Sequence, residues 1–301
     1  MTDRVTSRLL LVTNAAAGSA EDEAVEAALA VLRERADVVV RACTDPAELG
    51  DIVAGRDGRG LVVAGGDGSL HVLVRTLAER GELSSDDPLG VIPLGTGNDL
   101  ARALRLPLDP AEAALVVLDG RPRTLDLLAD DDGGVVVNAV HVGVGAEAAR
   151  RASDLKDRLG AAAYAVGSVA AGATEKGWRL RVEVDGAVLH DADDLVLMAG
   201  AGNGTTVGGG SPLAPDAVPD DGLVDVVVSL ATGPLQRVGY AVDLRRGEHV
   251  ERPDVLTARG RVLHIAGEEF PVNADGELSG PFTSRTWTVR PAAWAVVVPS
   301  P

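Results

Sequence analysis

Short apolar runs alternate with stretches of helical periodicity over residues 9–104. The run at 9–13 precedes a segment, 21–35, in which Ala, Val and Leu recur at helical spacing, and the run at 61–64 precedes a helical stretch at 69–80. Strands that alternate with helices predict a parallel sheet covered on both faces, with ligands at the carboxyl ends of the strands. The predicted strands are 9–13, 38–41, 61–64 and 89–92, and a short helix is expected at 100–104.

After residue 130 the pattern changes to short runs of strand type. We expect one long helix, at 146–171, to interrupt them, and this pattern is typical of a β-rich, sandwich-like domain. The sequence therefore predicts an α/β domain at 1–130, a β-rich domain at 131–285 and a C-terminal strand segment at 286–301. The predicted strands of the second half are 135–140, 179–184, 195–200, 223–229, 262–265 and 287–290.

The charge of the chain excludes one large class of partner. Its 301 residues carry 28 Lys and Arg against 45 Asp and Glu, so the formal net charge is −17. Nucleic-acid binding draws its affinity mainly from basic side chains, so we expect no nucleic-acid partner. A single cysteine, Cys43, rules out an intramolecular disulfide framework and suits a reducing compartment.

No part of the sequence reads as an export signal or a membrane span. The longest stretch of small and apolar residues, 160–173, contains glycines and a serine and is shorter than the roughly 20 residues that a spanning helix needs. We therefore expect a cytoplasmic protein that meets a membrane only at its surface.

Glycine-rich turns close two of the predicted strands. They read GGDGS at 65–69 and GTGND at 95–99. Glycine lets a backbone approach phosphates closely, and a helix start offers unpaired N–H groups to an anion. Asp67 would repel a phosphate unless Mg²⁺ or a substrate hydroxyl lay between them. Each turn by itself is equally well read as a capped strand-to-helix turn, but two on consecutive strands favour a nucleotide site.

Two acidic turns in the second half have two readings each. The segment PDAVPDDG at 215–222 is either a Mg²⁺ or Ca²⁺ site or a solvated hairpin, and spacing alone favours the hairpin. The segment NADGE at 273–277 holds two carboxylates around a glycine, which is also common in hairpin turns. Walker-type, dinucleotide and nucleophile-elbow motifs are absent from the sequence, and neither His71 nor His141 has a partner at metal-binding spacing.

In their order along the chain, these segments resemble the catalytic-domain family of the diacylglycerol kinases, especially its bacterial lipid kinases. Sphingosine and ceramide kinases are more distant relatives. A weaker family stretch matches VVVNAVHVGVGAEA at 135–148. The segments that carry the resemblance are LVVAGGDGSLHVLV (61–74), LGVIPLGTGNDLARAL (89–104), GGGSPLAPDAVPDDGLVDVVV (208–228) and NADGELSG (273–280).

The resemblance implies an NAD-kinase-like α/β domain with a parallel sheet, followed by a β-sandwich-like domain. It implies ATP as the phosphate donor, and it implies that the C-terminal strand at 286–301 returns towards the first domain. By position, the residues implied to bind the nucleotide are Asn14, Thr44, Gly65, Gly66, Asp67, Gly68, Ser69, Thr96 and Gly97.

The resemblance also implies metal ions and a base. Asp67 and Asp126 match acidic residues linked to the catalytic Mg²⁺, partly through water. A structural metal loop is implied at Val218, Asp221 and Leu223, with two carbonyls and one carboxylate as ligands. Asp275 and Glu277 match the motif that supplies the base for the lipid hydroxyl, and the sequence leaves open which of the two it is.

The activity implied is phosphoryl transfer from ATP to a lipid hydroxyl, that of diacylglycerol first of all. Val72 stands where the family usually has Glu, which leaves open a non-catalytic nucleotide- or lipid-binding relative. An NAD kinase-like enzyme is the other alternative, although the Asn-Glu motif of those enzymes is not evident. We expect a lipid substrate presented at a membrane surface, and a homodimer stays open.

Overall fold

The computed structural model describes residues 7–14, 19–144, 146 and 176–300. These residues form two compact units. Residues 1–127 and 291–301 make up the first unit, and residues 128–290 the second. The predicted long helix at 146–171, apart from Ala146, and the basic residues Arg150, Arg151, Lys156 and Arg158 lie outside the described residues.

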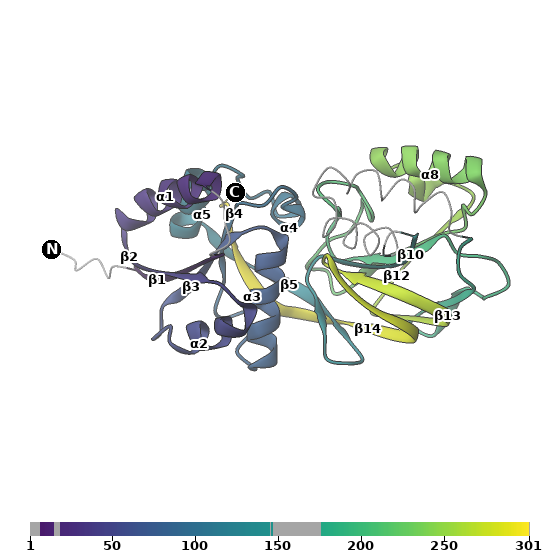
Figure 1. The fold of residues 1–301 in the computed structure, drawn as a ribbon, viewed down its shortest axis with the longest axis horizontal. Coiled ribbons are helices and arrows are strands. Elements are labelled where there is room, and N and C mark those ends of the chain that lie inside the picture. The colour runs from purple at the N-terminus through teal and green to yellow at the C-terminus, as the bar shows by residue number, and fades with distance from the viewer. Residues whose placement is uncertain (1–6, 15–18, 145, 147–175, 301) are drawn as a thin grey trace. The chain divides into compact units, whose positions relative to one another are not determined.

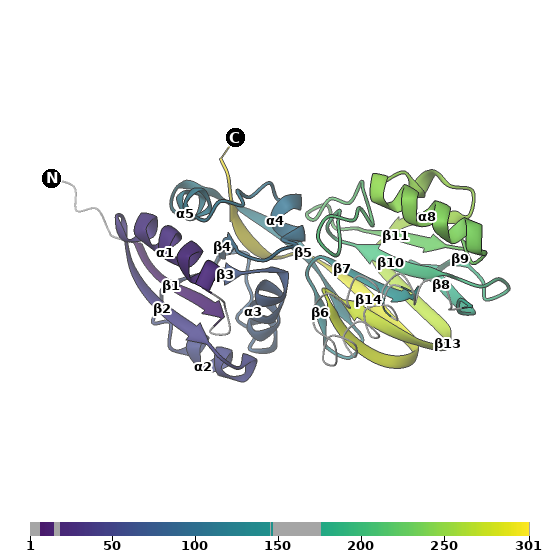
Figure 2. The same cartoon turned by 45° about the horizontal axis from the view of Figure 1, so that its top comes forward.

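The first unit is the parallel α/β domain that the alternating pattern predicts. Its four-stranded sheet has the order β2-β1-β3-β4, and all neighbouring pairs are parallel. Helices α1 and α5 cover one face of this sheet, and α2 and α3 cover the other (Figures 1 and 2). The elements are β1 (Ser7–Asn14), α1 (Ser19–Arg33), β2 (Ala36–Cys43), a 3₁₀ turn (Pro46–Glu48), α2 (Leu49–Ala54), β3 (Gly60–Gly65), α3 (Asp67–Glu79), β4 (Gly90–Pro93), α4 (Asp99–Ala103) and α5 (Pro110–Asp119).

Small and branched apolar side chains build the core of the first unit. Leu11, Val62 and Ile92 of the central strands pack against Leu29 and Leu32 of α1. Since a parallel strand is buried on both faces, its sequence is almost continuously apolar, which is what the short runs show. Because these strands are parallel, their carboxyl ends lie at the same edge of the sheet, and the polar residues of the glycine-rich turns follow there.

The second unit is β-rich and antiparallel. A ten-stranded sheet runs in the order β12-β11-β10-β7-β13-β14-β5-β6, with β8 paired to β13 and β9 paired to β8. Its core contains Phe270 and Trp287, both almost fully buried, together with branched aliphatic residues. The elements that lie wholly or partly in this unit are β5 (Arg121–Asp130), β6 (Val135–Val136), β7 (Ala139–Gly143), β8 (Leu180–Val184), β9 (Ala187–His190), β10 (Met198–Gly202), β11 (Val224–Ser229), α8 (Pro234–Arg246), a 3₁₀ turn (His249–Glu251), β12 (Val255–Gly260), β13 (Val262–Ala274) and β14 (Glu277–Val298). Residues 121–127 of β5 belong to the first unit.

The structure differs from the sequence prediction at several elements, and the prediction lacks α5, β5, β9 and β12. Helix α8 is absent from the prediction, because its apolar residues point both inward and outward and so give no single stripe. Strand β14 is far longer than the predicted 287–290, and its last part belongs to the first unit, where Leu89 N–H donates to the Ala295 carbonyl at 2.8 Å. Within the described residues, no helix combines the length and apolarity needed to cross a membrane.

Candidate functional site

The two glycine turns are packed against each other in the first unit. A side-chain Cβ added at Gly95 would lie 2.6 Å from Gly66 Cα, and one added at Gly66 would lie 2.9 Å from Gly95 Cα. Leu94 N–H also donates to the Gly65 carbonyl at 3.0 Å. Only glycine allows two backbones to approach this closely. The turns therefore form one cradle, which we call the glycine cradle: residues 65–69 and 95–98.

The N-terminus of helix α3 lies in the glycine cradle and has no side-chain cap. Helix α3 follows Gly66, which has no side chain that could cap the first N–H groups. Unpaired N–H groups at such a terminus bind anions. On the other turn, Asn98 adopts a left-handed conformation with φ 52°, and its Nδ2 donates to the Gly95 carbonyl at 2.6 Å. Thr96 and Gly97 are thereby held between Gly95 and the start of α4.

Asp67 connects the two turns. Its Oδ1 accepts a hydrogen bond of 3.3 Å from Leu100 N–H in the first turn of α4. Burial raises the pKa of the Asp67 carboxyl, and the backbone N–H groups of residues 98–100 only partly oppose this effect. Asp67 has no positively charged partner among the residues that the structure describes, so a bound cation would stabilise its charge.

The remaining nucleotide candidates lie at the same edge of the parallel sheet. Asn14 is the last residue of β1 and is paired in register with Cys43, the last residue of β2. Thr44 follows directly, and its N–H donates to Glu48 Oε2 at 3.1 Å. The carboxyl ends of β1 to β4 thus bring together all the predicted nucleotide residues, because neighbouring parallel strands end on the same side.

Asp126 lies on β5 and is almost completely buried, with 1% of its surface exposed. Its Oδ1 accepts from Ala292 N–H at 2.8 Å, and its carbonyl accepts from Trp294 Nε1 at 3.1 Å. Asp126 therefore helps to hold the end of β14 in the first unit. No group of three or more His, Cys, Asp or Glu side chains among the described residues could hold a metal ion together.

Asp275 lies in the tight hairpin turn between β13 and β14 in the second unit, and Glu277 is the first residue after this turn. Ala274 pairs with Glu277, and Asp275 and Gly276 form the turn with φ values of 50° and 93°. The Asp275 carboxylate accepts three backbone hydrogen bonds, from Val137 at 2.6 Å, Asn138 at 2.9 Å and Ala139 at 2.9 Å. Glu277, in contrast, is exposed. The two carboxylates that look equivalent in the sequence therefore have different surroundings.

The predicted metal loop contains an ion pair. Asp221 Oδ1 accepts from Leu223 N–H at 3.0 Å, and its Oδ2 is bound by Arg259 Nη2. Arg259 also contacts Asp225, at 3.2 Å. A guanidinium thus already balances the one carboxylate that the predicted cation would use, so this donor set does not fit a resident cation without displacing Arg259. The assignment of Val218, Asp221 and Leu223 as ligands stays a prediction.

The predicted site residues do not include Gly95, although its turn was predicted, and they do not include Arg259. Gly95 belongs to the GTGND segment, so its position in the motif was the available signal. Arg259 lies opposite Asp225 in the antiparallel pairing of β11 and β12. That register depends on the fold, and the sequence holds no local signal for it.

Comparison with known proteins gives matches for both halves of the chain. Residues 8–129 match the family described as the diacylglycerol kinase catalytic domain, and residues 138–298 match the YegS C-terminal NAD kinase beta sandwich-like domain. A Pseudomonas aeruginosa protein named "Probable lipid kinase YegS-like" is 35% identical over 290 residues, covering 93% of this chain and 91% of that protein. A Mycobacterium tuberculosis protein named "Diacylglycerol kinase" is 30% identical over 302 residues, covering 97% of this chain and 95% of that protein.

Solved structures support the fold. Two from Bacillus anthracis strain Sterne, one titled a "putative diacylglycerol kinase" and one a diacylglycerol kinase, superpose with TM-scores of 0.77 and 0.68. Their sequence identities are 20% and 18%; the first covers 99% of this chain and 97% of its own, and the second 97% of each. This likeness establishes the two-domain architecture.

Proposed function

Since this chain belongs to the diacylglycerol kinase catalytic-domain family, we propose that it is an ATP-dependent lipid kinase that phosphorylates a lipid hydroxyl, that of diacylglycerol first of all. The observation that carries the proposal is the contact between Gly66 and Gly95, because it joins both family turns into one cradle. The enzyme would work on the cytoplasmic side, at the surface of the membrane that holds its substrate.

The glycine cradle would bind the phosphates of ATP. The uncapped start of α3 would supply backbone N–H groups, and Ser69 and Thr96 would each contribute a hydroxyl, one from each turn. Phosphoryl transfer depends mainly on positioning and on charge stabilisation, so a rigid backbone cradle suits the reaction. Asn14 and Thr44, at the ends of β1 and β2, would border the rest of the nucleotide.

Mg²⁺ would be held through Asp67. This ion usually keeps several waters and is bound by one or two carboxylates together with the phosphates of the substrate, so a single half-buried carboxylate beside a phosphate cradle fits it. The ion would neutralise charge on the phosphates. Asp126 would contribute indirectly, because its Oδ1 is already engaged by Ala292 N–H.

Glu277 is the better candidate for the base that takes the proton from the lipid hydroxyl. A base needs an oxygen that the substrate can reach. The three backbone donors occupy both oxygens of Asp275, whereas Glu277 is exposed two residues further on. Asp275 would then position the hairpin and so the side chain of Glu277.

Transfer of labelled phosphate from ATP tests the proposal. The full chain is incubated with ATP, Mg²⁺ and either diacylglycerol or NAD, and we expect label in the lipid only. Glu277→Gln should lower turnover by about 10²–10⁴-fold with little change in nucleotide affinity. Label in NAD would instead support the NAD kinase-like alternative.

The half-buried Val72 allows a test of the alternative that the chain is a non-catalytic relative. The Val72→Glu variant restores the carboxylate that the family usually has and should keep activity. If the wild type bound ATP but transferred no phosphate, while Val72→Glu did, the chain would be a binding protein that has lost catalysis.

A further inference from the structure

Helix α8 has an inner face that is firmly attached to the second unit. Tyr240 is 4% exposed, packs with Met198 and Val255, and donates its hydroxyl hydrogen to Met198 Sδ at 3.2 Å. Leu244 packs against the same cluster. These contacts fix which side of the helix faces the sheet.

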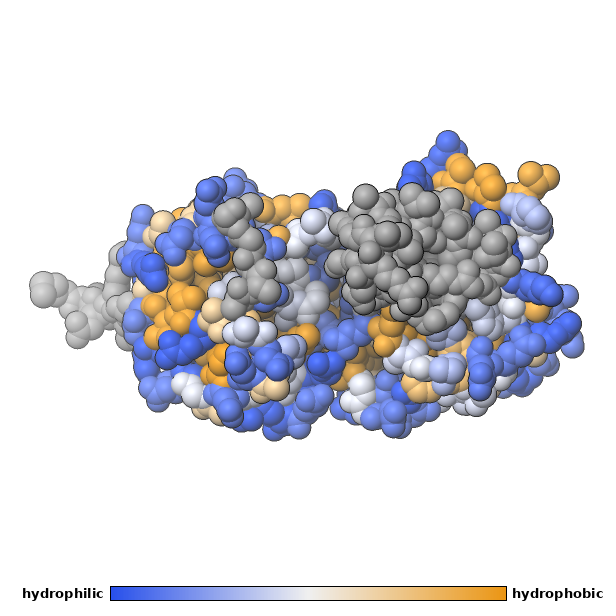
Figure 3. Space-filling model, viewed as in Figure 1, coloured by the Kyte–Doolittle hydropathy of each residue, from blue (hydrophilic) through white to orange (hydrophobic). Residues whose placement is uncertain are grey.

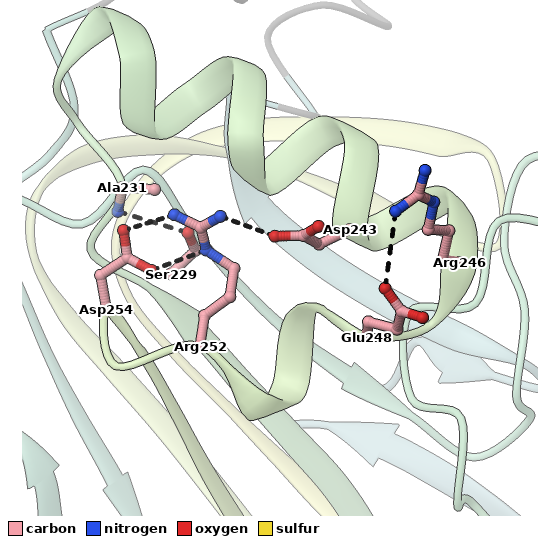
Figure 4. A network of polar contacts seen from close by, with 7 residues as sticks. All are labelled: Ser229, Ala231, Asp243, Arg246, Glu248, Arg252 and Asp254. Atoms are coloured by element: carbon pink, nitrogen blue, oxygen red, sulfur yellow. Dashed lines mark hydrogen bonds and ion pairs between the residues drawn. The ribbon is translucent and has the colours of Figure 1, made fainter.

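A charged clamp beneath the helix adds to this attachment (Figure 4). Arg252 binds Asp243 of α8 at 2.7 Å and both oxygens of Asp254 at 2.7 and 2.8 Å. The clamp lies close to the helix backbone, since a Cβ at Gly239 would lie 2.8 Å from Arg252 Nη1. The single acidic residue of α8 is therefore turned inward, and its charge is balanced there.

The outer face of α8 is apolar. Leu235 is 88% exposed, Val238 63% and Val242 44%. Their spacing of three and four residues places them on one stripe of the helix, because about 3.6 residues make one turn. Figure 3 shows apolar atoms gathered on the surface at the position of α8. The other exposed large apolar residues, Leu108, Leu115, Val188 and Val218, are far from α8 in sequence, and none forms such a stripe with another.

Two arginines border this stripe. By helical geometry, Arg245 and Arg246 lie three and four residues after Val242, so the two cations stand on either side of the C-terminal end of the stripe, about one turn beyond Val242. Both are exposed. Arg245 makes no ion pair with any residue that the structure describes, and Arg246 reaches Glu248 only at 3.8 Å, with both side chains more than half exposed. Such an exposed pair contributes little. The outer face of α8 thus combines apolar and positive groups within a chain of net charge −17.

We propose that the outer face of α8, formed by Leu235, Val238, Val242, Arg245 and Arg246, docks the protein on an anionic phospholipid bilayer. This inference rests on the proposed function, since it names the surface from which the lipid would be taken. A helix that presents apolar side chains between basic ones inserts them at the boundary of headgroups and acyl chains, while the cations contact anionic headgroups.

A second copy of the chain fits this surface less well. Three apolar side chains fall far short of the roughly 800 Å² per partner that a stable interface buries. Pairing two such faces would also bring the arginines of both copies together without added carboxylates.

Sedimentation with vesicles tests the proposal. The full chain is mixed at low salt with phosphatidylcholine vesicles that do or do not contain phosphatidylglycerol, and we expect binding to the anionic vesicles. Leu235→Ser with Val238→Ser should weaken binding about tenfold or more, and Arg245→Gln with Arg246→Gln about thirtyfold at low salt. These side chains lie outside the core, so the variants should keep the melting temperature of the wild type.

Matched controls use residues of similar exposure elsewhere. Val188→Ser, at a site 47% exposed in the same unit, and Arg33→Gln with Arg121→Gln, both exposed in the first unit, should leave vesicle binding unchanged. Equal binding by the wild type and the α8 variants would overturn the proposal. So would a wild-type dimer in light scattering that the Leu235→Ser, Val238→Ser variant converts to a monomer, because a second copy would then cover the face.

Activity assays separate this proposal from the proposed function. With diacylglycerol in vesicles, the α8 variants should lose activity in parallel with binding, and with a short-chain diacylglycerol dissolved as monomers they should match the wild type. Loss on both substrates would overturn a docking role. A wild type that phosphorylates neither lipid would refute the proposed function, while the vesicle sedimentation would still decide the role of α8.

Discussion

At the scale of single residues, surroundings distinguish carboxylates that look alike in the sequence. Asp275 is a structural acceptor for the backbone of residues 137–139, and Glu277 is exposed at the start of β14. An amide at position 275 would keep one acceptor oxygen but would turn an NH₂ group towards N–H donors. A buried donor left without a partner is costly.

We therefore expect the two conservative substitutions to affect different properties, stability at position 275 and turnover at position 277. Asp275→Asn should lower the free energy of unfolding by about 2 kcal/mol, because hydrogen bonds to charged groups are worth about 1.5–3 kcal/mol each. Glu277→Gln should leave stability unchanged and affect turnover. Urea denaturation and phosphate-transfer assays on both variants check this, and an unaltered denaturation midpoint for Asp275→Asn would contradict it.

A buried imidazole makes stability depend on pH. His141 lies on β7 between Asn273 and Gly200, and its Nδ1 is buried without a hydrogen-bond partner among the described residues. Burial lowers the pKa of His141 to about 4. The unfolded chain therefore binds this proton more readily than the folded one, so stability is complete above about pH 6.5 and falls between 6.5 and 4.

The protein should therefore lose stability in acid through the protonation of His141. Acidification from pH 6.5 to 4 should cost about 3 kcal/mol through His141 alone. His141→Gln should remove that part of the loss, and the difference between the two unfolding profiles isolates it from the titration of carboxylates. Parallel profiles for wild type and variant would contradict the prediction.

At the scale of elements, the pairing of β11 with β12 decides the chemistry of the loop before β11. The register places Arg259 opposite Asp225, from where its guanidinium also reaches Asp221. The side-chain hydrogen bond to Asp221 and the charge of Asp225 raise the pKa of Arg259, so it stays charged under all ordinary conditions. The guanidinium of Arg259 thus neutralises the negative charge of this loop, which a divalent cation would otherwise do.

Removal of Arg259 should expose a dependence on Mg²⁺. The melting temperature of the wild type should change little on chelation, whereas Arg259→Gln should be less stable and should regain stability with the logarithm of free Mg²⁺. Asp221→Ala should be destabilised with and without Mg²⁺. A clear drop of the wild-type melting temperature on chelation would instead support Val218, Asp221 and Leu223 as ligands beside Arg259.

At the scale of the whole molecule, two strands, β5 and β14, belong to both units. On β14, Trp287 lies in the core of the second unit and is 1% exposed, and Trp294 is fully buried in the first unit. Truncation of a buried Trp to Ala typically costs about 3–5 kcal/mol. These two tryptophans therefore serve as separate probes of the two units.

We expect each truncation to affect its own unit. Trp294→Ala should shift the unfolding transition of the first unit, and Trp287→Ala that of the second, with calorimetry as the measurement. If both variants shifted one common transition by the same amount, the two units would unfold as a single cooperative body.

The sequence by itself determined the class of each half and the positions of the two glycine turns. Strand and helix periods, the preference of glycine for tight turns and the change of pattern after residue 130 are local properties, and they were sufficient for the parallel sheet, the β-rich unit and the positions of the two turns. Local rules did not predict α8, because a helix whose apolar residues face both the core and the solvent has no single apolar stripe.

Only the tertiary structure decided what the individual polar residues do. Asp275 and the backbone donors that it binds are 136 to 138 residues apart, Arg259 and Asp221 are 38 apart, and Asp126 and Ala292 are 166 apart. The partner of a charged side chain depends on strand order and register, which arise when distant segments pack together. The sequence therefore identified the candidate carboxylates. The fold determined that Asp275 is bound by backbone N–H groups, that Asp221 is paired with Arg259 and that Glu277 is exposed.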